Sequence, residues 1–148
     1  MAGAQSTYKR TISASLRMMR GMVDGVIAFF VDGFGELDES SHYELKVVLN
    51  ELLINAIQHG CRSDPSRSIT IEAHLSKNGE ASLVVEDDGD GYDTRFANTT
   101  IEDPRMDAIE DIAESGRGLA IVRSLCEHFA VNAKGNKVAV RKRLARLR

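Results

Sequence analysis

Apolar side chains recur at helical spacing in three segments of this chain. The first follows residue 12 and ends at Gly33 and Gly35. The second covers residues 41–58, with Ser40 or Ser41 as its N-cap, and Gly60 lies just past its end. The third begins near Gly118 and continues to about residue 127. The apolar face predicted for the first helix consists of Leu16, Met19, Val23, Val26, Ile27 and Phe30.

Alternating apolar and polar residues predict a sheet beside these helices. The clearest strand covers residues 68–75, and a turn at 77–80 leads into a return strand over 81–86, so the two form a hairpin. Further strands are expected at 8–12, as a sheet edge, and at 129–133 and 137–142. The pattern therefore predicts an α/β chain of the α+β two-layer type, in which helices cover one face of a mixed, mostly antiparallel sheet.

Composition narrows the class of protein. The chain has 148 residues, 43% of them hydrophobic, which fits a single domain over residues 1–148 with a proper core. Its net charge of −3 gives no attraction to nucleic acid or to an anionic membrane, and no apolar run approaches a membrane span. The polar start indicates no signal peptide, and Cys61 and Cys126 form no Cys-x-x-Cys pair. These features indicate a cytoplasmic protein without a transition-metal site.

The second helix carries the first candidate chemistry. At 100° per residue, Glu44, Glu51, Asn55 and Gln58 fall on one narrow arc opposite the leucines. The amide oxygen of Asn55 suits Mg²⁺, and Glu51, one turn earlier, can accept a proton from an attacking hydroxyl group. Taken alone, the pair is far more typical of solvated helix residues, because such spacings are common by chance.

The second candidate is the turn that ends the hairpin, Asp88-Gly89-Asp90-Gly91. Asp88 can accept a hydrogen bond from an exocyclic amine such as adenine N6, and the two glycines let the backbone approach a base. The same tetrapeptide also suits an ordinary turn or an acidic calcium loop. Calcium is disfavoured, because the twelfth position of such a loop, counted from Asp88, is Thr99 and not a glutamate.

The third candidate, Gly116-Arg117-Gly118-Leu119, stands where the last helix begins. Free backbone amides at a helix start attract a phosphate, and Arg117 adds positive charge for a β- or γ-phosphate. No Gly-x-x-x-x-Gly-Lys-Ser/Thr is present, so the segment is not a P-loop.

Together, in this order, the three motifs resemble the Bergerat-fold ATPases, the superfamily that includes gyrase, histidine kinases and MutL-type proteins. The nearest resemblance is to the anti-sigma-factor serine/threonine kinases, and it covers nearly the whole chain. It implies that ATP and Mg²⁺ are cofactors, with Asn55 as the metal ligand and Glu51 as the catalytic base. His59, one turn further along, is either a surface residue or a nucleotide contact. The nucleotide-binding residues implied by the resemblance are Asn55, His59, Asp88, Gly89, Gly91, Gly116, Arg117, Gly118 and Leu119.

Residues 92–117 are weakly apolar and acidic. They are predicted either to form a lid that closes over ATP or to be an ordinary acidic loop with a short helix starting at Pro104. The basic residues at the end, from Arg141 to Arg148, are expected to form a solvated strand edge and tail.

The leading functional hypothesis is a protein kinase that phosphorylates a serine of a partner. By resemblance, the partners are a STAS-domain anti-sigma-factor antagonist and a sigma factor. The resemblance also implies a homodimer, because the face of the first helix often carries dimer contacts in the resembled kinases. The alternative is a binding module in which ATP only shapes the surface that holds a regulator. The catalytic part of a sensor histidine kinase is disfavoured, because no phosphoacceptor helix pair precedes the motifs. A gyrase-type or chaperone-type ATPase is disfavoured because it needs attached transducing domains.

Overall fold

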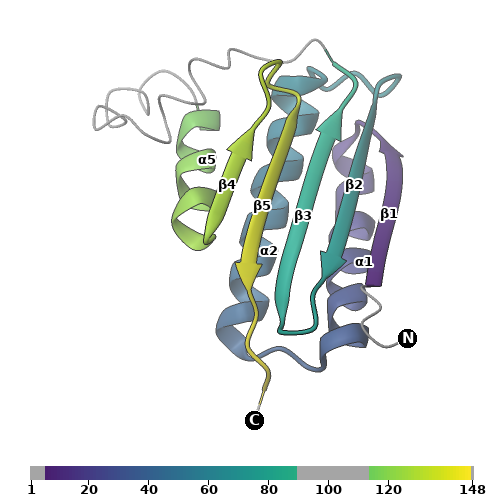
Figure 1. Ribbon diagram of the computed structural model, residues 1–148. Helices are drawn as coiled ribbons and strands as arrows, with labels where there is room; N and C mark the ends of the chain where they lie inside the picture. Colours follow the sequence, from purple (N-terminus) through teal and green to yellow (C-terminus); the bar gives the residue numbers. More distant parts are fainter. Residues whose placement is uncertain (1–5, 90–113, 148) are drawn as a thin grey trace.

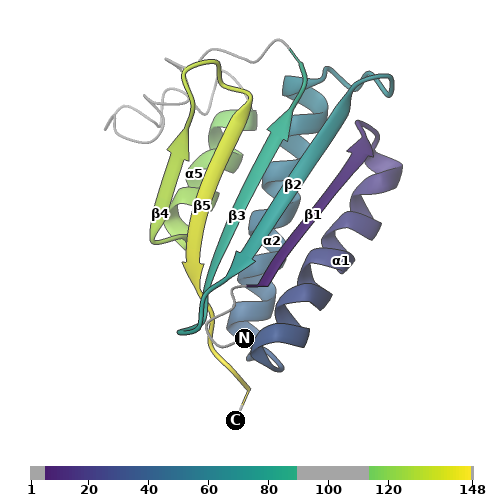
Figure 2. The ribbon, with the colours of Figure 1, turned by 45° about the vertical axis from the view of Figure 1, so that its right-hand side comes forward.

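A computed structural model of the chain describes residues 6–89 and 114–147, and over 114–117 it describes the backbone alone. Helices cover one face of a five-stranded sheet, whose strand order is β1-β2-β3-β5-β4 (Figures 1 and 2). Every strand pairing in the described part is antiparallel. The two-layer class is therefore confirmed. The elements are β1 Ser6–Ser13, α1 Leu16–Phe34, α2 Glu39–Ile54, η1 Asn55–Gly60, β2 Ser68–Leu75, β3 Glu80–Asp87, α5 Glu114–Leu125, β4 His128–Val131 and β5 Lys137–Arg143.

The central hairpin follows the predicted alternation. In β2 every second residue from Ile69 to Leu75 is buried, and β3 alternates in the same way as far as Asp87. The register pairs Ile69 with Asp87 and Leu75 with Ala81, while Gly79 makes the turn with φ +85°. This register decides which acidic residue at the end of β3 faces the helices.

Helix α1 differs from its prediction at both ends. Ser15 caps it, because its side chain accepts a hydrogen bond from the Arg17 amide at 3.2 Å. Leu16 is 51% exposed and does not join the apolar face, whereas Met22 is fully buried. Gly33 lies inside the helix, and only Gly35, with φ +107°, follows its end.

Helix α2 begins earlier than predicted. Asp38 is the N-cap, because its carboxylate accepts the amide hydrogen of Ser41 at 2.8 Å. The prediction of Ser40 or Ser41 as the cap is therefore wrong. Ser41 lies in the first turn, where its hydroxyl oxygen accepts the backbone N–H of Ala145 at 2.8 Å. The helix start thus holds the end of the chain.

The basic tail is docked against the protein. Leu144 is buried, and Asp38 donates its backbone N–H to the Ala145 carbonyl at 2.9 Å. The Arg146 guanidinium lies 4.2 Å from the centre of the Phe34 ring, and its Nε donates to the Phe34 carbonyl. Among the basic residues predicted to be solvated, Arg141, Arg143 and Arg146 are exposed, but Lys142 is buried, so the prediction is wrong for Lys142.

Two further helix boundaries bear on the motifs. The second helix changes at Asn55 from α to π geometry, η1, and the Cys61 N–H then bonds the carbonyl of Ala56 five residues back. Helix α5 begins at Glu114, four residues before Gly118. Within residues 6–89 and 114–147, none of the helices has the length and apolar character needed to cross a membrane.

Candidate functional site

Asn55 and Glu51 lie where α2 passes into η1. Asn55 is only 4% exposed, and its Nδ2 donates to the backbone carbonyl of Glu51 at 2.9 Å. That bond fixes the orientation of the amide, whose Oδ1 is the atom that suits a metal ion. Glu51 is half-buried. The π-turn that begins at Asn55 is a feature often found where a helix builds a functional site.

The third motif meets the first through Gly118. A Cβ atom added at Gly118 would lie 2.4 Å from Glu51 Oε1 and 3.5 Å from Asn55 Nδ2. The backbone of α5 therefore approaches both side chains so closely that only glycine fits without moving Glu51. Residues more than sixty positions apart in the sequence are brought together here.

The second motif meets the first through two glycines. A Cβ atom at Gly89 would lie 1.9 Å from the carbonyl oxygen of Gly60, and one at Gly60 would lie 2.2 Å from Asp87 Oδ2. The turn after β3 is thus packed against the end of η1. The contact requires glycine at position 89, because the obstacle there is backbone, whereas a Cβ at position 60 would displace the Asp87 side chain.

The acidic residue that faces this junction is Asp87, and the sequence-based choice of Asp88 is not supported. Asp88 is exposed, and its carboxylate accepts two hydrogen bonds from Ser68, one from the backbone N–H at 2.9 Å and one from the hydroxyl group at 3.2 Å. Asp87 is 4% exposed. The cause is the two-residue period of a strand, because β3 runs one residue beyond its predicted end and so turns Asp87 inward.

Burial alters the titration of Asp87. It raises the pKa of this carboxyl group above 3.8, and the neighbouring charges of Asp88 and Glu86 act in the same direction. The amide hydrogen of Gly89, donated to Asp87 Oδ1 at 2.9 Å, opposes the shift. A buried carboxylate with one such donor has remaining capacity to accept a hydrogen bond from an amine.

Asp87 and Asn55 line the same small hollow between the helices and the sheet. Apolar side chains form most of its wall, and Asn55, Asp87 and Asn136 supply its polar groups. Asn136 was missed by the sequence analysis; its Nδ2 donates to the Asp87 carbonyl at 2.9 Å. No motif marks Asn136, and only its place in the turn before β5 hints at it. The lining residues are Leu52, Asn55, Ala56, Val85, Asp87, Gly135, Asn136 and Val138.

The remaining residues that were predicted to bind nucleotide differ in burial and position. His59 is half-buried in the last turn of η1, and Leu119 is fully buried, so its side chain packs in the interior. Gly116 and Arg117 lie in the first turn of α5, where backbone amides lack partners within the helix. Gly91 and residues 92–113, most of the predicted lid, lie outside the described residues.

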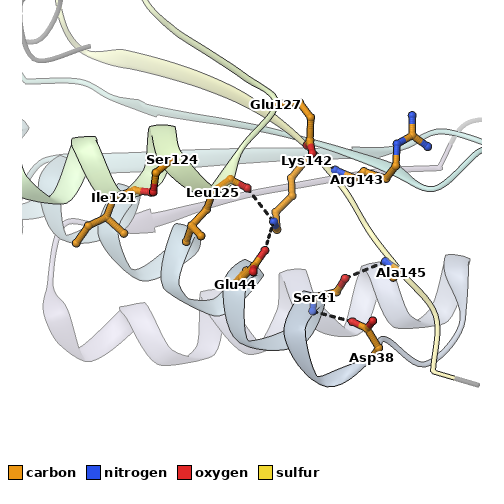
Figure 3. A network of polar contacts seen from close by, with 10 residues as sticks. All are labelled: Asp38, Ser41, Glu44, Ile121, Ser124, Leu125, Glu127, Lys142, Arg143 and Ala145. Atoms are coloured by element: carbon orange, nitrogen blue, oxygen red, sulfur yellow. Dashed lines mark hydrogen bonds and ion pairs between the residues drawn. The ribbon is translucent and has the colours of Figure 1, made fainter. Parts of the chain in front are cut away.

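The predicted polar arc of α2 is not one site. Gln58 is exposed, and Glu44 pairs with Lys142 of β5 at 2.5 Å, two helical turns away from Glu51 (Figure 3). The arc divides because Glu44 faces Lys142 of β5, whereas Asn55 lies near Asp87 of β3 and Gly118 of α5.

Comparison of sequences identifies similar proteins. A family model described as a histidine kinase-like ATPase domain matches residues 12–142. An anti-sigma F factor of Shouchella clausii (strain KSM-K16) is 30% identical over 104 residues, which is 68% of this chain and 68% of that protein. An anti-sigma F factor of Geobacillus kaustophilus (strain HTA426) is 28% identical over 127 residues, 82% of this chain and 81% of that protein.

Solved structures with a similar fold are also known. A structure of the RsbU and RsbW domains of Rv1364c from Mycobacterium tuberculosis matches 97% of this chain and 34% of that one, with a TM-score of 0.64 and 19% identity. The mycobacterial sensor histidine kinase MprB matches 95% of this chain and 100% of that one, with a TM-score of 0.53 and 16% identity. At these identities the likeness is one of fold.

Proposed function

The chain belongs to the histidine kinase-like ATPase domain family, and from that premise we propose that it is an ATP-dependent serine/threonine protein kinase acting as an anti-sigma factor. Membership of the family agrees with the resemblance that the three motifs predict. The relatives with the name anti-sigma F factor support the partner-switching role. The proposal places the protein in the cytoplasm, where sigma factors act.

One observation carries the proposal: Gly118 lies against Glu51 and Asn55, while Asp87 shares a hollow with the same Asn55. A carboxylate suited to a base, an amide suited to a metal ion, a phosphate-binding helix start and a small hollow with mostly apolar walls therefore adjoin one another. Phosphoryl transfer needs these groups in such an arrangement, because it depends on positioning and on charge stabilisation.

The roles proposed for the residues follow from their surroundings. The adenine ring would lie in the hollow, with its amine donating to the Asp87 carboxylate and its faces against Val85, Val138 and Ala56. Asn55 Oδ1 would hold Mg²⁺, which supplies charge neutralisation for the phosphates. The amides at the start of α5 would bind the terminal phosphates.

Glu51 is proposed as the base. It would take the proton of a partner serine hydroxyl as the serine oxygen bonds to the γ-phosphorus and the bond to the β-phosphate oxygen breaks, leaving ADP. The serine belongs to an antagonist protein with a STAS domain, and a sigma factor is the competing partner. We also propose that two copies of the chain associate and that His59 contacts the nucleotide.

The test begins with calorimetric titration of ATP into the chain, with and without Mg²⁺. We expect Mg²⁺-dependent binding, which Asn55→Ala should abolish and Glu51→Ala should retain. The same variants are then incubated with ATP and the STAS-domain proteins of the source organism, and the mass of each is measured. One added phosphate per antagonist, absent with Glu51→Ala, is the expected result.

Two outcomes would contradict parts of this proposal. A nucleotide-dependent complex with the antagonist, without any gain of phosphate mass, would make the protein an ATP-shaped binding module. Unchanged transfer by Glu51→Ala would remove Glu51 from the role of base while leaving the kinase activity in place.

A further inference from the structure

Lys142 is a buried cation within the helix-covered face of the sheet. It lies on β5, where it follows the inward-facing Val138 and Val140 at two-residue spacing, and it is only 5% exposed. Its Nζ donates to Glu44 Oε1 of α2 at 2.5 Å and to the backbone carbonyl of Leu125 at 2.8 Å (Figure 3). A single ammonium group therefore connects β5, α2 and α5.

Both partners suit a positive charge. Leu125 is the last residue of α5, and the final carbonyls of a helix lack partners within it and carry the negative end of the helix dipole. The Glu44 carboxylate supplies the counter-charge and is about one-third exposed, with 35% of its side chain accessible. The contact is thus a C-terminal cap on α5 that is also fastened to α2.

The spacing links this contact to the candidate site. Glu44 precedes Glu51 by seven residues, and Leu125 follows Gly118 by seven residues. At 1.5 Å of rise per residue, each pair is separated by about 10 Å along its helix. Because α2 and α5 run in opposite directions (Figure 1), they meet at two levels. Lys142 joins them at one level, and Gly118 lies against Glu51 at the other.

We propose that Lys142 is a positioning residue: it fixes α5 along α2 and so holds Gly118 and the start of α5 in register with Glu51 and Asn55. The inference rests on the proposed function, because it concerns the end of the site that would bind the terminal phosphates. If α5 slid along α2, the amides that bind phosphate would shift, whereas the hollow built from α2, η1, β3 and β5 would stay in place.

The test compares Lys142→Met with the parent chain by calorimetric titration of Mg²⁺-ATP and of AMP. Methionine keeps the apolar stem and removes the ammonium group. We expect the Kd for ATP to rise about tenfold and that for AMP to change less than twofold, since AMP lacks the terminal phosphates. Lys142→Arg, which keeps a charged donor, should recover part of the ATP affinity. Lys137→Met is the matched control, because Lys137 lies on the same strand and is exposed.

A second measurement needs no nucleotide. Hydrogen exchange in the free protein should be faster over residues 122–125 in Lys142→Met and unchanged in Lys137→Met. Unchanged exchange over residues 122–125 in Lys142→Met would overturn the inference, because it would show that Lys142 does not cap α5. An equal loss of affinity for ATP and AMP would also overturn it, because that result indicates a general structural role for Lys142. If the parent chain bound no ATP, the proposed kinase function would fall, while the exchange result would still decide whether Lys142 holds α5.

Discussion

Asp87 is a buried carboxyl group, and folding alone does not favour the burial of an ionisable side chain. Its side chain contacts Gly60 and Gly89, and its pKa is raised mainly by burial. Carboxyl groups in such surroundings cluster at functional sites, where the environment is adjusted to a task at some expense of stability. Its neighbour Asp88 is exposed and holds the start of β2. The two adjacent aspartates therefore differ in role: Asp87 faces the candidate site, and Asp88 binds the start of β2.

The two aspartates provide a matched pair of substitutions. Asp87→Asn should weaken adenine nucleotide binding roughly 10-fold to 100-fold, the range expected when a hydrogen bond to a charged group, worth about 1.5–3 kcal/mol, is lost. Asp88→Asn should leave the affinity within about twofold. Calorimetric titration of ATP into both variants decides between them. Loss of binding in Asp88→Asn alone would restore Asp88 as the adenine-binding residue.

The raised pKa of Asp87 also predicts how stability depends on pH. A carboxyl group whose pKa is higher in the folded protein than the unfolded value of 3.8 stabilises the fold when protonated. That contribution is lost as pH rises through the raised value, and at neutral pH the buried charge is unfavourable. Asp87→Asn removes the titration, so the nucleotide-free variant should have the higher Tm at pH 7.

Thermal unfolding across a pH series is the measurement for this effect. The Tm difference between Asp87→Asn and the parent should shrink as pH falls towards the unfolded pKa. A constant difference would show that it arises from packing around the new amide and not from the charge.

Two glycines in helices allow a similar comparison. At Gly21, in α1, a Cβ would meet nothing within 4 Å, so Gly21→Ala should stabilise the protein by about 0.5–1 kcal/mol through helix propensity. Gly118→Ala carries the same propensity gain but displaces the Glu51 carboxylate, since the added Cβ would lie 2.4 Å from Oε1. We expect kcat to fall about tenfold or more in Gly118→Ala and to stay unchanged in Gly21→Ala. Equal activity of the two variants would contradict the close approach of α5 to Glu51.

At the scale of elements, α2 contacts the tail, β5 and the candidate site at successive points along its length. Its first turn binds the tail at Ala145, its middle pairs with β5 through Glu44, and its end carries Glu51 before η1 begins. The polar residues along its length therefore serve different neighbours. A substitution in the middle of α2 is therefore expected to lower the free energy of unfolding more than it affects nucleotide binding.

The Glu44–Lys142 pair should respond asymmetrically to truncation. Glu44→Ala leaves the ammonium of Lys142 buried with only a neutral carbonyl partner, and breaking a buried pair in this way costs about 3–5 kcal/mol. Lys142→Met leaves Glu44, whose side chain is 35% accessible and reaches water, so its cost should be smaller. Urea unfolding of both variants measures the difference. A greater loss in Lys142→Met would mean that the carbonyl of Leu125 is the more important partner.

At the scale of the whole molecule, the two cysteines report on opening of the fold. Cys61 is buried after η1 and Cys126 is half-buried after α5, and burial raises the pKa of each thiol from 9.0 to about 11. Since the thiolate is the reacting form, alkylation by iodoacetamide at pH 8 should be about a hundredfold slower in the native protein than in urea. Mass spectrometry of timed samples from Cys61→Ser and Cys126→Ser resolves the two sites. Rapid labelling of native Cys61 would contradict its burial.

Much of the fold follows from local patterns. The alternation over residues 68–75 predicted β2 with its correct bounds, and the turn at Gly79 predicted the hairpin. Helix boundaries were less predictable: Asp38, Ser40 and Ser41 are all good N-caps, and in the structure Asp38 caps the helix while the Ser41 hydroxyl binds the tail. A local sequence pattern does not contain that contact.

The sequence by itself determined the family, the two-layer class and the three motifs, because periodicity and glycine spacing are local properties of the chain. Tertiary structure alone decided that Asp87 faces the hollow, because the direction of a strand residue depends on register and strand length. It also decided that Asn136 joins Asp87 and that Lys142 joins Glu44. These pairs are separated by 49 and 98 positions, and contacts over such distances form only when sheet pairing and helix packing bring the elements together.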